Sequence, residues 1–198
     1  MQARAARTRE VLLRAAAEVF DEVGYPGASI SKVGERAGVT AGAIYFHFRS
    51  KEGLARAVIQ EQAADLEFPV SETGLQQLLD VTMYLAEQMR HNTLLRAGVR
   101  LAVEENEVGL RDYAIYEWWA DRFARELATA RGKGQLLPSV DEEACASLLV
   151  AAFTGTQIMS QIANGRADLT TRIASMWRCL LPALAPPDVI ERLTVPAP

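Results

Sequence analysis

Residues 29–48 read SISKVGERAGVTAGAIYFHF, and this stretch decides the fold of the first part of the chain. Ser29 stands where it can cap a short helix, and Gly38 supplies the left-handed residue of a tight turn. Thr40 follows at the position that caps a second short helix. Helices of two turns are unstable alone, so we expect this pair to pack on a neighbouring helix. Two short helices joined by a glycine turn are typical of the helix-turn-helix arrangement, whose second helix enters the major groove of DNA.

The neighbouring helix is predicted just before this stretch, over residues 5–23. Apolar side chains recur there at three- and four-residue spacing, which indicates one apolar stripe on a helix. They are Leu12, Ala15, Ala16, Val19, Phe20 and Val23. Gly24 is placed to end this helix, and Pro26-Gly27 marks the turn that follows. The sequence therefore predicts a three-helix unit at the N-terminus.

Helical periodicity continues through the rest of the chain. No alternating apolar and polar pattern longer than four residues indicates a strand. The predicted helices lie near residues 50–66, 72–90, 94–105, 110–131, 141–163 and 169–184. The expected fold class is therefore all-α, with about nine helices in total. We expect a helix-turn-helix DNA-binding domain over residues 1–50 and a second helical domain over residues 51–198, linked by helix 50–66.

Composition excludes several classes of protein. The chain has 198 residues, is 49% hydrophobic and 23% charged, and contains two Cys and two His, namely Cys145, Cys179, His47 and His91. It is too apolar for a disordered chain and too poor in Cys and His for a disulfide framework, a metal site or a catalytic triad. We therefore expect a protein that has no enzyme activity and binds no cofactor or metal. The first residues lack a signal-peptide core and no run of 18 apolar residues occurs, so we expect no membrane span and a cytoplasmic location.

Charge is divided unevenly along the chain. Residues 1–60 contain nine Lys and Arg against six Asp and Glu, a net charge of +3, whereas the rest carries −7 within a total of −4. A basic first part followed by an acidic remainder favours a polyanion as the partner of the first part. A difference of this size also arises by chance, so charge alone does not decide the function.

Two segments together resemble a known family. AGVTAGAIYFHFRSKEGL at residues 37–54, preceded by VFDEVGYPGASI at 19–30, is similar to the N-terminal DNA-binding domain of the TetR family of repressors. The similarity covers about the first 60 residues, and one departure is Gly34, where the family more often has Ala. The resemblance implies a dimer that binds double-stranded operator DNA and a second domain that binds a small-molecule inducer.

In the TetR-like register, eight residues are predicted to meet DNA. Thr40, Ala41 and Gly42 form the first turn of the recognition helix, where small side chains let the backbone approach base edges. The others are expected to reach phosphates, and they are Tyr45, His47, Lys51, Lys32 and Ser29. Phe46 and Phe48 are expected in the core. Taken alone, His47 and Tyr45 would equally suit packing or the general surface.

Aromatic side chains gather in the middle of the second part, and they include Tyr84, Trp118, Trp119, Phe123 and Phe153. Large rings with few ionisable groups among them suit a mostly apolar cavity, whereas rings at helical spacing also occur in an ordinary core. Trp118 and Trp119 point about 100° apart on a helix, so we expect one to face a cavity and the other an interface. Thr156 and Gln157 could supply hydrogen-bonding points close to Phe153.

A narrower resemblance concerns the same part. LLRAGVRLA at 94–102, FTGTQ at 153–157 and MWRCLLPAL at 176–184 are similar to the γ-butyrolactone receptor subgroup of the TetR family. This resemblance implies a ligand among small signalling lactones or furans with an alkyl chain, whose binding releases DNA. It further implies that the pocket tryptophan is Trp119, or Trp118 if a loop differs in length, and that Thr156 bonds a ligand carbonyl or hydroxyl.

Arg96 and Arg100 lie one turn apart on a predicted helix and allow two interpretations. They could meet a ligand carboxylate, which would favour a furan acid over a neutral lactone. The alternative is that they form a solvated face or pair with Glu104 and Glu105 on the next turn.

The helices predicted over 141–163 and 169–184 are apolar on more than one face, which indicates burial on two sides. One side would meet the chain's own core and the other the same helices of a second copy, so we expect a homodimer through these two helices. Two alternatives stay open for the function: a TetR-like regulator that senses drugs or other hydrophobic metabolites, and a receptor homologue that no longer binds lactones.

Overall fold

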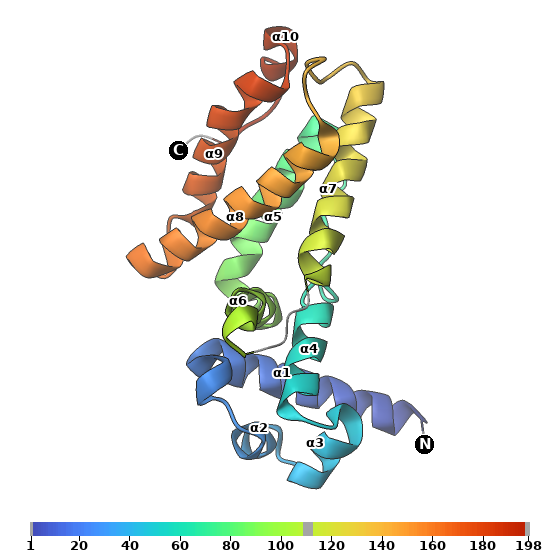
Figure 1. Cartoon of the computed structure of the whole chain (residues 1–198), viewed down its shortest axis with the longest axis vertical. Helices are drawn as coiled ribbons and strands as arrows, with labels where there is room; N and C mark the ends of the chain where they lie inside the picture. Colours follow the sequence, from blue (N-terminus) through green and yellow to red (C-terminus); the bar gives the residue numbers. More distant parts are fainter. Residues whose placement is uncertain (1, 109–112, 197–198) are drawn as a thin grey trace. The chain divides into compact units, whose positions relative to one another are not determined.

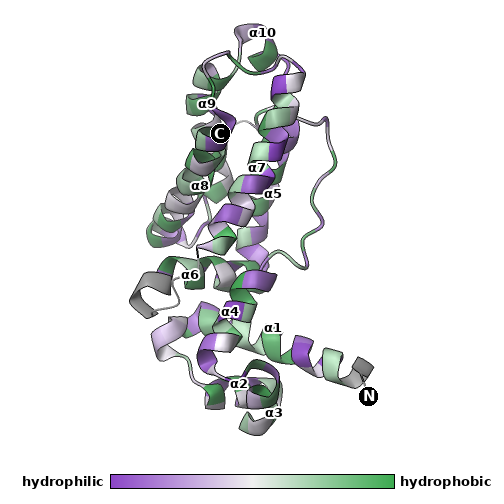
Figure 2. Cartoon of the chain, turned by 45° about the vertical axis from the view of Figure 1, so that its right-hand side comes forward, coloured by the Kyte–Doolittle hydropathy of each residue, from purple (hydrophilic) through white to green (hydrophobic). Residues whose placement is uncertain are grey.

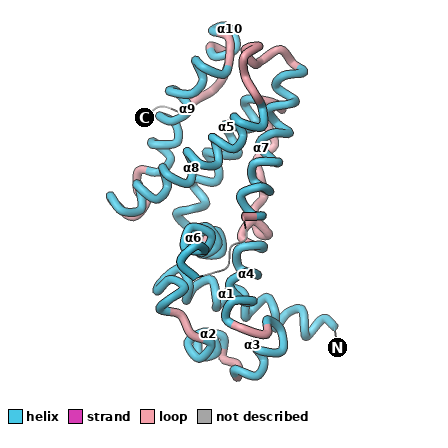
Figure 3. Tube along the Cα trace, viewed as in Figure 1, coloured by secondary structure: helices cyan, strands magenta, loops and turns pink. Residues whose placement is uncertain are grey.

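The computed structural model describes residues 2–108 and 113–196, and side chains within 5–104 and 113–196. Ten helices and no strand occur in these described ranges, so the all-α prediction is confirmed (Figure 3). The chain forms two compact units, Met1–Leu66 with Asn92–Ile115, and Glu67–His91 with Tyr116–Pro198. The division by function at residues 50 and 51 remains a prediction.

The first unit contains the DNA-binding motif (Figure 1). Its helices are α1 (Gln2–Gly27), α2 (Ile30–Ala37), α3 (Ala41–Phe48), α4 (Lys51–Glu61) and α6 (Thr93–Val108). Helix α1 packs on α2, α4 and α6, so the short helices are held by a longer one, as their length requires. The fully buried side chains that join them include Leu12, Phe20, Ile44 and Leu54.

The predicted turn signals of the motif are largely confirmed. The Ser29 hydroxyl accepts a hydrogen bond from the Lys32 amide at 3.2 Å and caps α2. Gly38 adopts φ 66° and ends α2, whereas Gly24 adopts φ 68° and interrupts the helical conformation inside α1, so both take the left-handed φ expected of them. Thr40 occupies the N-cap position of α3, but its side chain makes no capping hydrogen bond.

Two boundaries differ from the sequence prediction. The helix expected to reach residue 66 ends at Glu61, because the next residues form tighter bonds such as Ala64 N–H to the Glu61 carbonyl at 2.9 Å. A short helix, α10 (Pro187–Ile190), begins at a proline whose fixed φ suits a first helical turn. It buries Val189, so this segment packs on the second unit.

The second unit is built from α5 (Leu75–His91), α7 (Ala114–Gly132), α8 (Glu142–Asn164), α9 (Leu169–Leu184) and α10, with the first two residues of α7 assigned to the other unit. Helix α9 packs on α5 and α8. Trp177 is fully buried between them, and its indole nitrogen donates to the Thr82 hydroxyl at 2.7 Å, so the ring's one polar atom is satisfied.

Helix α8 is unusually apolar for its exposure (Figure 2). Within the described residues it is long and apolar enough to cross a membrane by length and composition, and 28% of the relevant window is buried inside the chain. The same pattern is typical of a helix that packs against a second copy of the chain. The absence of a membrane span stays a prediction.

Candidate DNA-binding surface and candidate ligand site

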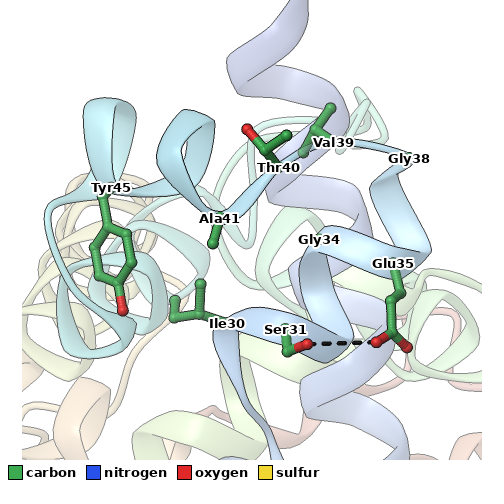
Figure 4. A pocket seen from close by; sticks show the side chains of 9 residues that line it. All are labelled: Ile30, Ser31, Gly34, Glu35, Gly38, Val39, Thr40, Ala41 and Tyr45. Carbon is green, nitrogen blue, oxygen red and sulfur yellow. Dashed lines mark hydrogen bonds between the residues drawn. The ribbon is translucent and has the colours of Figure 1, made fainter.

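The first turn of α3 presents small side chains to the surface. Thr40, Ala41 and Gly42 are exposed, as predicted for residues that let the backbone approach base edges. Helices α2 and α3 enclose an open cavity of about 650 Å³ beside this turn (Figure 4). It is lined by Ile30, Ser31, Gly34, Glu35, Gly38, Val39, Thr40, Ala41 and Tyr45. The surface expected to meet DNA is therefore concave and continuous from α2 to α3.

The residues predicted to reach phosphates lie on both sides of this turn. Tyr45 is 52% exposed, and the Lys51 ammonium lies 4.2 Å from the centre of the Tyr25 ring. Partial burial lowers the pKa of Lys51, and the ring face partly compensates for the lost hydration. On α2, the Lys32 ammonium donates to the Gly27 carbonyl at 2.8 Å, while Ser29 is engaged in the cap. Their contacts with DNA remain predictions.

The prediction that Phe46 lies in the core is wrong, whereas the same prediction for Phe48 is confirmed. Phe48 is buried, but Phe46 is 79% exposed and its ring lies 5.1 Å from that of His47. The reason is geometric: α3 buries one face through Ile44 and Phe48, which are four residues apart, and a residue midway between them points away. Helix α3 thus carries an exposed aromatic ring that the sequence pattern did not reveal.

Gly53 was also missed, although it fixes the turn between α3 and α4. A Cβ atom at this position would lie 2.2 Å from the Phe48 carbonyl oxygen, which only glycine avoids. The Gly53 amide donates to the Ser50 hydroxyl at 3.0 Å and caps α4, while Arg49 takes φ 66°. The sequence signal that could have identified this close contact is a glycine in the first turn of the helix predicted over residues 50–66.

The second unit brings three of the predicted ligand residues together. Trp119 is 8% exposed, and its ring lies 4.8 Å from that of Trp118, which is 42% exposed. Phe68 joins them to the third residue, because its ring centre lies 6.2 Å from Trp119 and 6.0 Å from Tyr84. The Tyr84 hydroxyl accepts a hydrogen bond from the Glu67 amide at 3.2 Å. We call these four residues the tryptophan cluster.

Three further predicted residues lie on α8. Phe153 and Thr156 are half-buried, and no hydrogen bond or ring contact among the described residues joins them to the tryptophan cluster. Gln157 is buried, and its side-chain carbonyl accepts from the Arg166 guanidinium at 3.1 and 3.2 Å. Gln157 therefore already serves to satisfy a buried cation, and a ligand role for these three residues stays a prediction.

Arg96 and Arg100 belong to the first unit and are paired there. The Arg96 guanidinium binds Asp21 at 2.7 Å, and Arg100 binds Glu104 at 2.7 Å and donates to the Asp21 carbonyl. These bonds fasten α6 to α1, and the Glu104 pairing is one of the two interpretations drawn from the sequence. The carboxylate-binding interpretation has no support in this geometry. Glu105 lies outside the described side chains.

The described side chains contain no group of three or more His, Cys, Asp and Glu residues that could hold a metal ion. Cys145 and Cys179 are both free thiols, the first buried and the second exposed. Burial raises the pKa of the Cys145 thiol, so it is a neutral packing residue at physiological pH.

Two parts of the chain match domains of known proteins. Residues 12–58 match the family of bacterial regulatory proteins named tetR, and residues 72–186 match the tetracyclin repressor-like C-terminal domain. The A-factor receptor protein of Streptomyces griseus is 42% identical over 97% of this chain and 69% of its own length. The TetR regulator TylP of Streptomyces fradiae has a TM-score of 0.87 and 42% identity, over 98% of this chain and 93% of that one.

A further solved structure, described as a gamma-butyrolactone receptor (ArpA-like protein), has a TM-score of 0.72 and 30% identity, over 94% of this chain and 92% of that one. The two family matches, over residues 12–58 and 72–186, together cover most of the chain. This chain belongs to the TetR family of DNA-binding transcriptional repressors.

Proposed function

We propose that this chain is a cytoplasmic, homodimeric repressor, without enzyme activity, that a γ-butyrolactone or furan-type signal releases from a pseudo-palindromic operator. The observation that carries the proposal is the tryptophan cluster. It places a nearly buried Trp119 among aromatic rings, within residues 72–186, which match the tetracyclin repressor-like C-terminal domain. The 42% identity with the A-factor receptor over 97% of the chain supports the class of signal.

The free energy gained by burying an alkyl chain is large enough for the repressor to bind a signal present at low concentration. Burial of six methylene groups at about 0.8 kcal/mol each supplies roughly 5 kcal/mol, which is between three and four decades of affinity. Release of DNA then requires only that the ligand bind one conformation of the repressor better than the other by a few kcal/mol.

Tyr45 and His47 provide the test of the DNA surface. We expect the double variant Tyr45→Ala/His47→Ala to weaken binding to every DNA sequence by about tenfold or more, because phosphate contacts position the protein without reading bases. A mobility shift with operator and unrelated DNA at several salt concentrations measures this. Affinity unchanged for both DNAs would contradict the assignment of these side chains to phosphates.

The proposed dimer uses the uncovered faces of α8 and α9. On α8, Leu148, Met159 and Ile162 are 54%, 64% and 81% exposed. At 100° per residue they fall within about 60° of one another on the helix surface. Gly155 lies on the same face, and nothing stands within 4 Å of the position of its Cβ atom, so a second helix could approach closely. On α9, half-buried or exposed apolar residues recur at helical spacing, namely Met176, Cys179, Leu180 and Ala183.

We expect the double variant Leu148→Asp/Ile162→Asp to dissociate the dimer, because two carboxylates would be buried beside their symmetry mates. Sedimentation would then report the chain mass of 21.7 kDa for the variant and twice this mass for the unaltered protein. Val70→Asp is the matched control, since Val70 is 98% exposed and lies outside α8. A variant that keeps the dimer mass would exclude this interface.

A further inference from the structure

Arg122 on α7 is a half-buried cation that packs on an aromatic ring. Its guanidinium carbon lies 3.9 Å from the centre of the Phe68 ring. Within the described part of the chain, this side chain makes no hydrogen bond and no ion pair. Arg96, Arg100 and Arg131, by contrast, each hold a carboxylate.

The position of Arg122 links it to the tryptophan cluster. Trp119 and Arg122 are three residues apart and therefore share one face of α7. Both contact the same ring, because Phe68 lies 6.2 Å from Trp119 and 3.9 Å from Arg122. A ligand that packs against Trp119 and displaces Phe68 would meet the guanidinium directly.

The electrostatics of this place favour an anion. Burial lowers the pKa of Arg122, yet a guanidinium stays protonated at physiological pH. Glu126 attracts it weakly but uses one carboxylate oxygen to accept from the Gly74 amide at 3.3 Å, and Arg125 repels it. An aromatic face stabilises a cation but offers no acceptor for its five N–H donors. A carboxylate would satisfy two of these donors at once.

We propose that Arg122 determines the ligand class by binding a carboxylate on the ligand at the tryptophan cluster, so that an acid is preferred over a neutral lactone or ester. This inference rests on the proposed function of the cluster as the inducer site. It assigns to Arg122 the role that the sequence had suggested for Arg96 and Arg100, which are paired in the other unit.

The test uses three compounds with the same six-carbon chain: a furan carboxylic acid, its methyl ester and a γ-butyrolactone. Each is titrated into a preformed complex of the full chain with operator DNA, and the concentration that releases half of the DNA is measured at fixed salt. We expect the acid to release the unaltered protein from DNA at a concentration at least about tenfold lower than the ester does, which is near the lower end of the range for a hydrogen bond to a charged group.

Arg122→Met should remove this preference and leave the response to the ester within about twofold, because methionine keeps much of the apolar stem. Arg122→Lys keeps the charge without the two-pronged geometry and should retain part of the preference. Arg125→Met is the matched control, since Arg125 is an exposed cation on the same helix, and it should keep the full preference.

The outcomes of this test distinguish a wrong role for Arg122 from a wrong location of the inducer site. A preference for the acid that persists in Arg122→Met, or release by the lactone or ester at concentrations equal to or below that of the acid, overturns the role of Arg122 and leaves the inducer site intact. Failure of all three compounds to release the unaltered protein overturns both.

Discussion

Trp119→Ala will leave the affinity for operator DNA unchanged and raise the inducer concentration needed for release by about 30-fold or more. The lost ring removes roughly 2–3 kcal/mol of apolar and aromatic contact with a ligand, which corresponds to this factor. Trp119 belongs to the second unit and the recognition helix to the first, so the substitution removes no side chain from the predicted DNA-binding surface. Mobility shifts with and without inducer measure both quantities on the same sample.

Trp118→Ala is the matched control for this variant. Trp118 precedes Trp119 on the same helix but is 42% exposed, compared with 8% for Trp119. We expect the control to keep release within about threefold of the unaltered protein, since an exposed ring contributes little to a buried ligand. Normal release in both variants would place the ligand outside the tryptophan cluster, and loss of release in Trp118→Ala alone would make Trp118 the pocket tryptophan in place of Trp119.

Gly53→Ala will destabilise the first unit by about 2 kcal/mol, and operator affinity will fall with it. The added Cβ atom would lie 2.2 Å from a backbone oxygen, which no side-chain rotation can relieve. Overpacking of this kind costs roughly 1–3 kcal/mol and sometimes more. The better helix propensity of alanine returns at most about 1 kcal/mol. Urea unfolding followed by circular dichroism measures the change in the free energy of unfolding.

Gly42→Ala, on the neighbouring helix α3, is expected to have the opposite effect on stability. The nearest atom to a Cβ at this position is the Thr40 hydroxyl at 3.8 Å, an ordinary contact, so alanine fits without strain. We expect this variant to be as stable as the unaltered protein or more stable by up to about 1 kcal/mol. A Gly53→Ala protein with the stability of Gly42→Ala would show that the turn at Phe48 tolerates a side chain.

The DNA-binding motif could be predicted because its signals are local. Ser29, Gly38 and Gly24 act within a few residues of their own positions, through a cap or a left-handed φ. Such features depend on the backbone conformation of single residues and are visible in one sequence. The inward positions of Ile44 and Phe48 follow from helical spacing in the same way.

Other residues depend on contacts that no local pattern reveals. Phe68 lies in the connection between α4 and α5, which has no helical period, and only the folded unit shows that it bridges Trp119 and Tyr84. Arg96 and Arg100 have a spacing that suits a ligand anion equally well. Their partner Asp21 lies 75 residues away from Arg96 in the chain. Long-range ion pairs of this kind are decided by packing.

One mobility-shift titration tests the account most directly. DNA from beside the gene is bound by the unaltered protein at fixed low salt, where phosphate contacts are strongest, and the furan and butyrolactone compounds are then added. We expect a shifted band of the protein–DNA complex that disappears when one of these compounds is added. A shifted band that persists with all of these compounds and disappears with hydrophobic drugs would contradict the proposed class of signal. Absence of DNA binding at low salt would contradict the proposal that the protein is a repressor.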